Sequence, residues 1–272
     1  MTNIRRRRWA RKFVNLPRAT LVALIAWTAA AQAADCPRKG TLGTSRILGV
    51  DAATTPQVGL KNFPQTLPLR DHEVVLTFDD GPWPPTTPRV LAALAQECAR
   101  ATFFLIGKPG SEHPELVRRI AAKGHTIGHH TWLHRSLMQI NPSETTEEID
   151  RGIAAVETAL NGVATSVPST PFFRFPGFET TPATLELLQS RGIVVFGADL
   201  WASDWNPMTP KQELKLIIDR LKTARKGIIL FHDPKAHTAA MLPAFLRYLR
   251  DNDYRLVHVV PAAHHADVDG AP

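Results

Sequence analysis

The chain has 272 residues, of which 44% are hydrophobic, and its formal net charge is +7. This length suffices for one domain with a large core or for two small domains. Residues 1–33 hold seven Lys and Arg side chains and no Asp or Glu, and so account for the whole net charge. Without that segment the chain is neutral, so its charge gives no reason to infer nucleic-acid binding. We therefore expect no nucleic-acid partner.

Residues 1–33 have the pattern of a secretory signal peptide. A basic cluster precedes an apolar run over residues 21–31, and Ala31-Gln32-Ala33 is typical of a cleavage site. The alternative is a transmembrane anchor, but the run is shorter than the roughly 20 residues of a spanning helix. We therefore predict an exported protein, periplasmic or secreted, that keeps no stable membrane anchor after cleavage.

The chain has two cysteines, Cys36 and Cys98. An even number in a protein predicted to leave the cytosol favours one structural disulfide, because disulfides persist in oxidising compartments. Two free thiols are the alternative. A bond between Cys36 and Cys98 would tie the N-terminal arm to the first predicted helix.

Residues 34–70 are rich in Gly, Pro and Thr without clear periodicity, which predicts an N-terminal arm packed on the domain. From residue 71 onward, short β-branched or aromatic runs alternate with helical patterns. The predicted strands are residues 73–78, 101–107, 126–128, 172–175, 193–198, 227–231 and 255–260. The predicted helices are residues 88–95, 114–123, 142–160, 182–190, 210–221 and 242–250.

This alternation is typical of a parallel sheet, either open or closed into a barrel. We expect seven strands in a single α/β domain over residues 71–263, followed by a flexible tail over residues 264–272. In a barrel of this kind, the residues just after the strands share one rim, where active sites form. The polar residues at these positions are Asp79, Asp80, His130, His134, Arg174, Asp199, Asp204, His232 and Asp233.

Asp79 and Asp80 are adjacent carboxylates at the end of the first predicted strand, before the turn-forming pair Gly81-Pro82. Two such charges repel each other unless a cation or a proton is present. One carboxylate that binds a metal beside one that acts as a base is therefore chemically sensible. An ordinary surface turn is the alternative for this segment alone.

His130 and His134 are four residues apart, a separation that allows two imidazoles to bind one metal ion. With Asp80 they form a set of two histidines and one carboxylate, which leaves positions open for water and substrate. His125 and His129 are weaker candidates, and we expect them to lie beside the ligands or on the surface.

Arg174 ends an apolar strand and needs a carboxylate partner if it is buried. His232 likewise ends an apolar strand. A lone histidine in that position is more often structural than catalytic, and only the other polar residues of the rim favour a catalytic role.

Five ordered motifs carry a family resemblance: TFDDGP, HTWLH, RFP, SDW and LFH. Together they resemble the polysaccharide deacetylase family, carbohydrate esterase family 4, with its NodB homology domain, over residues 73–261. The resemblance implies a distorted (β/α) barrel of about seven strands. It also implies a metal-dependent hydrolase that removes acetyl groups from N-acetylated glycans, with zinc, or else cobalt, as the metal.

By this resemblance Asp79 is the general base. The residues that would bind the metal are Asp80, His130 and His134. Arg174 would orient Asp79, and Asp204 would support His232 as the general acid. Trp205 and Leu230 would line the slot for the acetyl methyl group.

The chain departs from the family pattern in three places. His129 stands where many members have Asn, and Gly177 stands where many have Tyr, which removes a ring expected near the rim. The segment around Asp199 differs from the commoner spacing, so Asp199 receives no role.

Two other functions compete with removal of N-acetyl groups. An O-acetyl esterase acting on xylan-type glycans would use the same metal and base. A catalytically silent carbohydrate-binding protein would lack at least one of the base, ligands and acid, and here all five residues are present.

Overall fold

The computed structural model describes residues 38–165 and 167–262. The predicted signal peptide, Cys36 and the predicted tail lie outside these residues, so the leader and the disulfide stay predictions. Within the described residues, no helix has both the length and the apolar character needed to cross a bilayer.

All seven predicted strands are present, and three more join them in a ten-stranded sheet. The strands, in chain order, are β1 (Arg46–Val50), β2 (Gln57–Val58), β3 (Glu73–Asp79), β4 (Thr102–Leu105), β5 (Thr126–His129), β6 (Phe172–Phe173), β7 (Val194–Phe196), β8 (Leu200–Trp201), β9 (Gly227–His232) and β10 (Arg255–Pro261). The order across the sheet is β1-β10-β3-β4-β5-β6-β7-β2, with β9 pairing both β3 and β8.

Every strand pair in this sheet is parallel. The α/β fold class is therefore confirmed, and the topology is consistent with a distorted barrel. Strands β1 and β2 come from the predicted arm and pair with β10 and β7. Their apolar segments are too short to show a period in the sequence.

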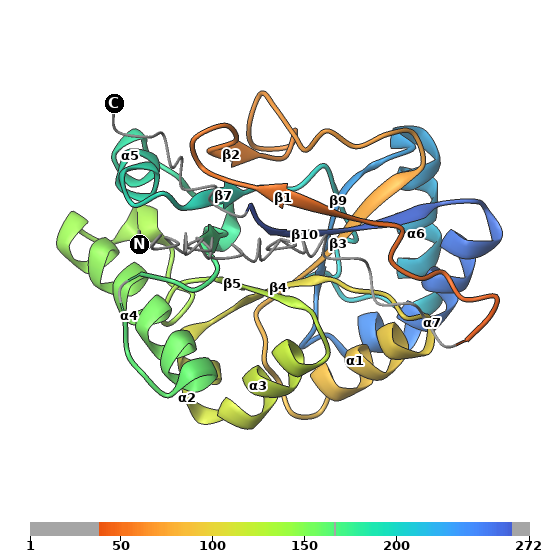
Figure 1. Cartoon of the computed structure of the whole chain (residues 1–272), viewed down its shortest axis with the longest axis horizontal. Coiled ribbons are helices and arrows are strands. Elements are labelled where there is room, and N and C mark those ends of the chain that lie inside the picture. The colour runs from red at the N-terminus through yellow and green to blue at the C-terminus, as the bar shows by residue number, and fades with distance from the viewer. Residues whose placement is uncertain (1–37, 166, 263–272) are drawn as a thin grey trace, which may run out of the picture. The chain divides into compact units, whose positions relative to one another are not determined.

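The helices are α1 (Thr87–Gln96), α2 (Gly107–Glu112), α3 (Pro114–Ala122), α4 (Pro142–Asn161), α5 (Pro182–Ser190), α6 (Pro210–Ala224) and α7 (Ala236–Asp251), with short 3-10 turns η1 (Leu137–Gln139) and η2 (Pro176–Phe178). Helices α4, α3, α1, α7 and α6 contact one another in that order and form a layer along the sheet (Figure 1). Helix α7 begins six residues before its predicted start and continues through Pro243, which lies in its interior. Helix α2 was not predicted, since its sequence holds two Gly and one Pro in six residues.

Helices α4 and α6 begin with hydrogen-bonded caps. Asn141 and Glu144 form a capping box at α4, and Thr209 and Gln212 form one at α6. Each side chain satisfies a backbone N–H that the first turn leaves without a partner.

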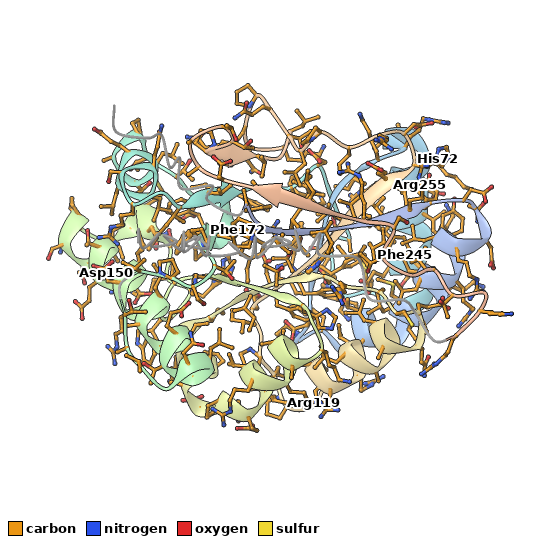
Figure 2. All side chains as sticks on the ribbon, in the orientation of Figure 1. His72, Arg119, Asp150, Phe172, Phe245 and Arg255 are labelled. Atoms are coloured by element: carbon orange, nitrogen blue, oxygen red, sulfur yellow. The ribbon has the colours of Figure 1, made fainter. Side chains whose placement is uncertain are left out.

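The strands are buried on both faces, as parallel strands covered by helices usually are. Along β3, Val74, Leu76 and Phe78 pack in the cluster that faces helices, whereas Val75 belongs to a second cluster. Phe172 lies among the strands and Phe245 lies between α7 and the sheet (Figure 2). Because side chains alternate along a strand, Thr77 and Asp79 share the face of Val75.

Candidate active site

The carboxylate pair sits where β3 ends. Asp79 is the last residue of the strand and is buried. Asp80 leaves the strand with a φ of 72°, which is uncommon for a residue with a side chain. This turn directs the two neighbouring carboxylates differently. Asp79 stays on the inner face of β3, and Asp80 reaches toward the histidines that follow β5.

Arg174 lies at the end of β6 and is completely buried. Its Nη1 donates to Asp79 Oδ1 at 2.7 Å and to Thr77 Oγ1 at 2.8 Å. Its Nη2 donates to the Gly197 carbonyl oxygen at 2.7 Å. Burial lowers the pKa of Arg174, and the charge of Asp79 opposes that shift. The carboxylate partner that the sequence required for Arg174 is therefore Asp79.

Three side chains converge as a potential metal site. Asp80 Oδ1 lies 3.4 Å from His130 Nε2 and 3.3 Å from His134 Nε2. All three candidate ligand atoms lie within 4.8 Å of one another. Asp80 Oδ1 is buried and accepts no hydrogen bond from the described residues. A buried carboxylate oxygen without a donor fits a cation at this point.

The hydrogen bond of His130 and the pKa of His134 also fit a metal. His130 Nδ1 donates to the Arg174 carbonyl oxygen at 2.6 Å, so Nε2 is the ring nitrogen that faces Asp80. Burial and the neighbouring His130 lower the pKa of His134. The lowered pKa favours the neutral imidazole of His134, which is the form that binds a metal.

The loop that carries these histidines is held against α4. Leu133 N donates to Glu148 Oε2 at 2.8 Å. A Cβ on Gly152 would come within 2.4 Å of the Thr131 carbonyl carbon, so only glycine permits this approach. Thr131 and His134 have φ values of 63° and 59°. Backbone strain of this kind gathers at functional sites, where packing maintains it.

His232, the last residue of β9, is paired with Asp204. Its Nδ1 and its backbone N both lie 2.7 Å from Asp204 oxygens. Burial by itself lowers the pKa of His232, but the hydrogen bond and charge of Asp204 outweigh it and raise the pKa to about 9. Nε2 of His232 lies 3.9 Å from Asp80 Oδ2. Asp79 Oδ2 lies 3.9 Å from His130 Nε2.

Aromatic rings continue from His232. The ring centroids of His232 and Trp205 are 6.0 Å apart, those of Trp205 and Trp201 are 5.9 Å apart, and those of Trp201 and Phe178 are 6.1 Å apart. Phe178 has a φ of 60° and brings its ring to 5.9 Å from the Arg174 guanidinium carbon. Phe178, one residue after Gly177, therefore places a ring near Arg174.

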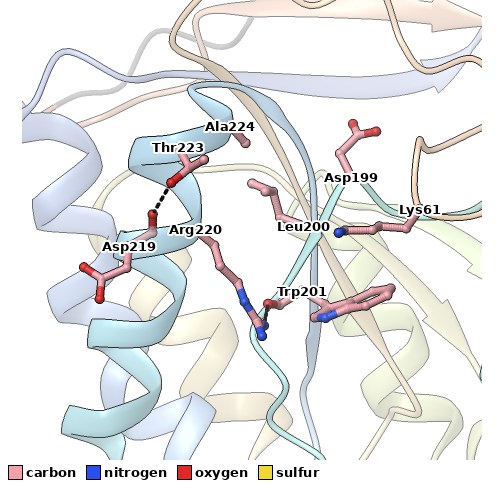
Figure 3. A pocket seen from close by; sticks show the side chains of 8 residues that line it. All are labelled: Lys61, Asp199, Leu200, Trp201, Asp219, Arg220, Thr223 and Ala224. Carbon is pink, nitrogen blue, oxygen red and sulfur yellow. Dashed lines mark hydrogen bonds between the residues drawn. The ribbon is translucent and has the colours of Figure 1, made fainter.

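A pocket of about 640 Å³ lies beside Trp201. Lys61 Nζ lies 5.3 Å from the centre of the Trp201 ring, and Arg220 Nη1 donates to the Trp201 carbonyl oxygen (Figure 3). The side chain of Trp205 is 47% exposed. This side of the site therefore offers ring surface together with cationic and polar groups.

Three polar residues noted in the sequence do not join this constellation. His125 lies at the amino end of β5, where its Nδ1 accepts from Ala101 N. His129 is buried with Nε2 3.5 Å from Glu157 Oε1. Asp199 accepts hydrogen bonds from Leu60 N, Thr66 Oγ1 and Ile228 N, so it joins the N-terminal segment to β9.

The sequence did not indicate a buried acid near Asp204. Glu213 on α6 is fully buried and shares the hydroxyl of Thr238 on α7 with Asp204. No motif spacing signals this group, because Glu213 lies in an amphipathic helix among other charged residues. Only the packing of α6 against α7 brings it to Asp204.

Three comparisons relate the chain to known proteins. The sequence model described as Polysaccharide deacetylase matches residues 67–196. A peptidoglycan-N-acetylglucosamine deacetylase of Bacillus cereus is 36% identical over 138 residues, which cover 51% of this chain and 48% of that relative. A chitooligosaccharide deacetylase of Rhizobium leguminosarum bv. trifolii is 32% identical over 165 residues, which cover 60% of this chain and 72% of that protein.

A solved structure shows the same fold. The peptidoglycan deacetylase of Bdellovibrio bacteriovorus aligns with a TM-score of 0.72 and 30% sequence identity, over 83% of this chain and 61% of that one. The chain thus spans about half the length of the Bacillus cereus relative and less than two thirds of the Bdellovibrio protein.

Proposed function

Because the chain belongs to the polysaccharide deacetylase family, we propose that it is a metal-dependent hydrolase that removes acetyl groups from N-acetylated glycans. One observation carries the proposal. Asp79 and His232 both lie beside the ligand set Asp80, His130 and His134, each with a side-chain atom 3.9 Å from one of its members. A base, a cation site and an acid within such reach are the parts that amide hydrolysis requires.

A divalent cation, zinc or else cobalt, bound by Asp80, His130 and His134 would polarise the acetyl carbonyl and lower the pKa of the attacking water. Asp79 takes the proton of that water as it attacks the carbonyl carbon. Arg174 holds Asp79 Oδ1 and so leaves Oδ2 facing the ligand set.

The acid step belongs to His232. An amine is a poor leaving group as an anion, so its nitrogen must receive a proton as the C–N bond breaks. The Asp204 carboxylate raises the pKa of His232 to about 9, so the imidazolium is present at neutral pH. With Nδ1 on Asp204, the proton on Nε2 is directed toward Asp80 and the reacting bond. The products are acetate and the free amine.

The aromatic rings support a sugar polymer as the substrate. Trp and Phe rings pack against the apolar C–H face of a pyranose, and a sequence of rings can contact more than one sugar. Trp205 and Leu230 would line the slot for the acetyl methyl group. Leu230 pairs with Thr77 in the β3–β9 register and is buried beside the base. Trp201 and Phe178 would contact the neighbouring sugar.

The experiment compares two substrates with three proteins. Acetate release is measured from an N-acetylated chitooligosaccharide and from an activated acetyl ester. Asp79→Asn should lower kcat on both substrates by about 10² through loss of the base. His232→Ala should lower amide hydrolysis far more than ester hydrolysis, since a good leaving group departs without a proton. Asp251→Asn, an exposed substitution at the end of α7, is the control and should leave both rates unchanged.

The competing functions predict other outcomes. A silent carbohydrate-binding protein would release no acetate from any substrate in the wild type. An O-acetyl esterase would release acetate from acetylated xylan and not from the chitooligosaccharide. Unchanged rates in Asp79→Asn would reject the mechanism.

Export and the organisation of the chain belong to the same proposal. We propose that residues 1–33 are removed on export to the periplasm or the exterior, that residues 71–263 form the catalytic domain, and that Cys36 and Cys98 are joined. Thiol titration of the exported protein tests the last point. Two reactive thiols in the unreduced, denatured protein would contradict it.

A further inference from the structure

A buried hydroxyl lies between two buried carboxyl groups beside His232. Thr238 Oγ1 is 2.8 Å from Asp204 Oδ2 and 2.9 Å from Glu213 Oε1. All three side chains are fully buried. A hydroxyl has one hydrogen to donate, whereas an ionised carboxylate only accepts hydrogen bonds. Both contacts are hydrogen bonds only if one of the carboxyl groups carries a proton.

Asp204 has the donors that an ionised carboxylate requires. Its Oδ1 faces His232 Nδ1, and its Oδ2 accepts from the backbone N of His232, both at 2.7 Å. If Asp204 carried the proton, the His232 ring would lose the negative charge of its partner.

Glu213 has far fewer donors. Its Oε2 is buried and has no hydrogen-bond partner among the described residues. The nearest cationic candidate is His237, whose Nε2 is 3.7 Å away and 3.0 Å from the Asp204 carbonyl oxygen, which it can serve as donor. The other charged groups that face Glu213 are Asp204 and His232. Burial, and then the charge of Asp204, raise the pKa of Glu213 to about 8.

We propose that Glu213 is a protonated positioning residue, whose carboxyl group donates to Thr238 Oγ1 so that the Thr238 hydroxyl donates to Asp204. Its proton fixes the single hydrogen of Thr238 on Asp204 Oδ2. Asp204 then accepts from three donors and keeps its negative charge. An ionised Glu213 would instead compete for the Thr238 hydrogen and place a second negative charge beside Asp204.

The consequence reaches the reacting bond through His232. A fixed, ionised Asp204 holds Nδ1 of His232 and keeps Nε2 directed toward Asp80. The effect on catalysis rests on the proposed role of His232 as the acid. The protonation of Glu213 does not rest on it, so the two are tested separately.

The protonation is tested without any activity measurement. Infrared spectra of the purified full chain at neutral pH should contain a carbonyl band of a protonated carboxyl group that disappears at alkaline pH. The spectra are compared in Asp233→Asn, because Asp233 is also buried with a pKa raised to about 7 by burial and would add a band of its own. Adding Glu213→Gln to that variant should remove the remaining band. A band that survives in the double variant, or an Asp233→Asn spectrum without one, would overturn the proposal.

The positioning role is tested by rescue. Glu213→Ala removes the donor to Thr238, and kcat on an N-acetylated chitooligosaccharide should fall by about tenfold, the lower range for a residue that orients an active-site group. Glu213→Gln keeps a neutral donor of the same shape, so kcat at neutral pH should return to within about twofold of the wild type.

Two results would contradict this role. In one, Glu213→Gln is as slow as Glu213→Ala. In the other, Glu213→Ala is as fast as the wild type at neutral pH, which would mean that Glu213 does not position Asp204. If Glu213→Ala does not fold, the infrared band and the Gln variant still decide the matter. A wild type inactive on every glycan would reject the proposed function and leave the protonation test intact.

Discussion

The pairing of His232 with Asp204 makes a quantitative prediction for Asp204→Asn. In the wild type, two Asp204 oxygens lie 2.7 Å from donors of His232, and the pKa of His232 is about 9 against an ordinary 6.5. Each pKa unit corresponds to about 1.4 kcal/mol, so the imidazolium is favoured by about 3 kcal/mol. Asn has nearly the same shape but no charge. Without the charge of residue 204, the effect of burial, which lowers the pKa of His232, is opposed less strongly, so the pKa falls.

The expected result is a shift of the alkaline limb of kcat. In the wild type, kcat on an N-acetylated oligosaccharide should fall as pH rises through about 9, where His232 loses its proton. In Asp204→Asn this limb should move down by about two units or more, given the shift that Asp204 maintains. Both proteins are assayed at saturating substrate and the same saturating cation concentration, with the exposed Asp251→Asn as the control.

The same pair also links stability to pH. Because the folded-state pKa of His232 is raised, its contribution to the free energy of unfolding is complete below pH 6.5 and disappears as pH rises through about 9. An alkaline limb that stays in place in Asp204→Asn, or moves upward, would refute this account of His232.

Three further predictions concern the metal, the substrate and acid stability. His134→Ala should no longer bind the cation in titration calorimetry. It should still unfold at the wild-type temperature, since the His134 side chain is 38% exposed and packs little. Stoichiometric cation binding by this variant would disprove the role of His134 as a ligand. Trp201→Ala should raise KM about tenfold for an N-acetylated tetramer and leave hydrolysis of a small acetyl ester unchanged, as expected for a ring contact of about 1.4 kcal/mol; equal effects on both substrates would count against a second sugar site. Burial lowers the pKa of His125 to about 3 and that of His258 to about 4. Their contribution to the free energy of unfolding should therefore be complete above pH 6.5 and decline as pH falls toward these values. The decline should reach up to about 1.4 kcal/mol per pH unit for each histidine. The free energy of unfolding is measured by urea unfolding at several pH values in this range. It should depend less steeply on pH in His258→Gln than in the wild type, and an identical dependence would contradict the lowered pKa of His258.

The sequence by itself indicated the candidate metal ligands and the positions of the main strands along the chain. Asp79 and Asp80 are adjacent, and His130 and His134 are four residues apart, so short segments fix most of their geometry. The strands from Glu73 onward are buried on both faces, and their β-branched and aromatic runs are continuous enough to be read directly. The strand-end rule then placed the polar residues on one rim without any knowledge of their contacts.

Only the tertiary structure decided which distant residues pair. Arg174 is 95 positions from Asp79, and its guanidinium reaches the carboxylate because the inner faces of β6 and β3 meet inside the sheet. The position of the Phe178 ring near Arg174 depends on a left-handed backbone conformation at Phe178, which the sequence did not reveal. The proton proposed on Glu213 depends on one hydroxyl lying between two buried acids, a contact made when α6 packs on α7. Local spacing determines which groups are neighbours along the chain. Packing determines which charged groups are buried together, and the pKa values of those groups depend on this packing.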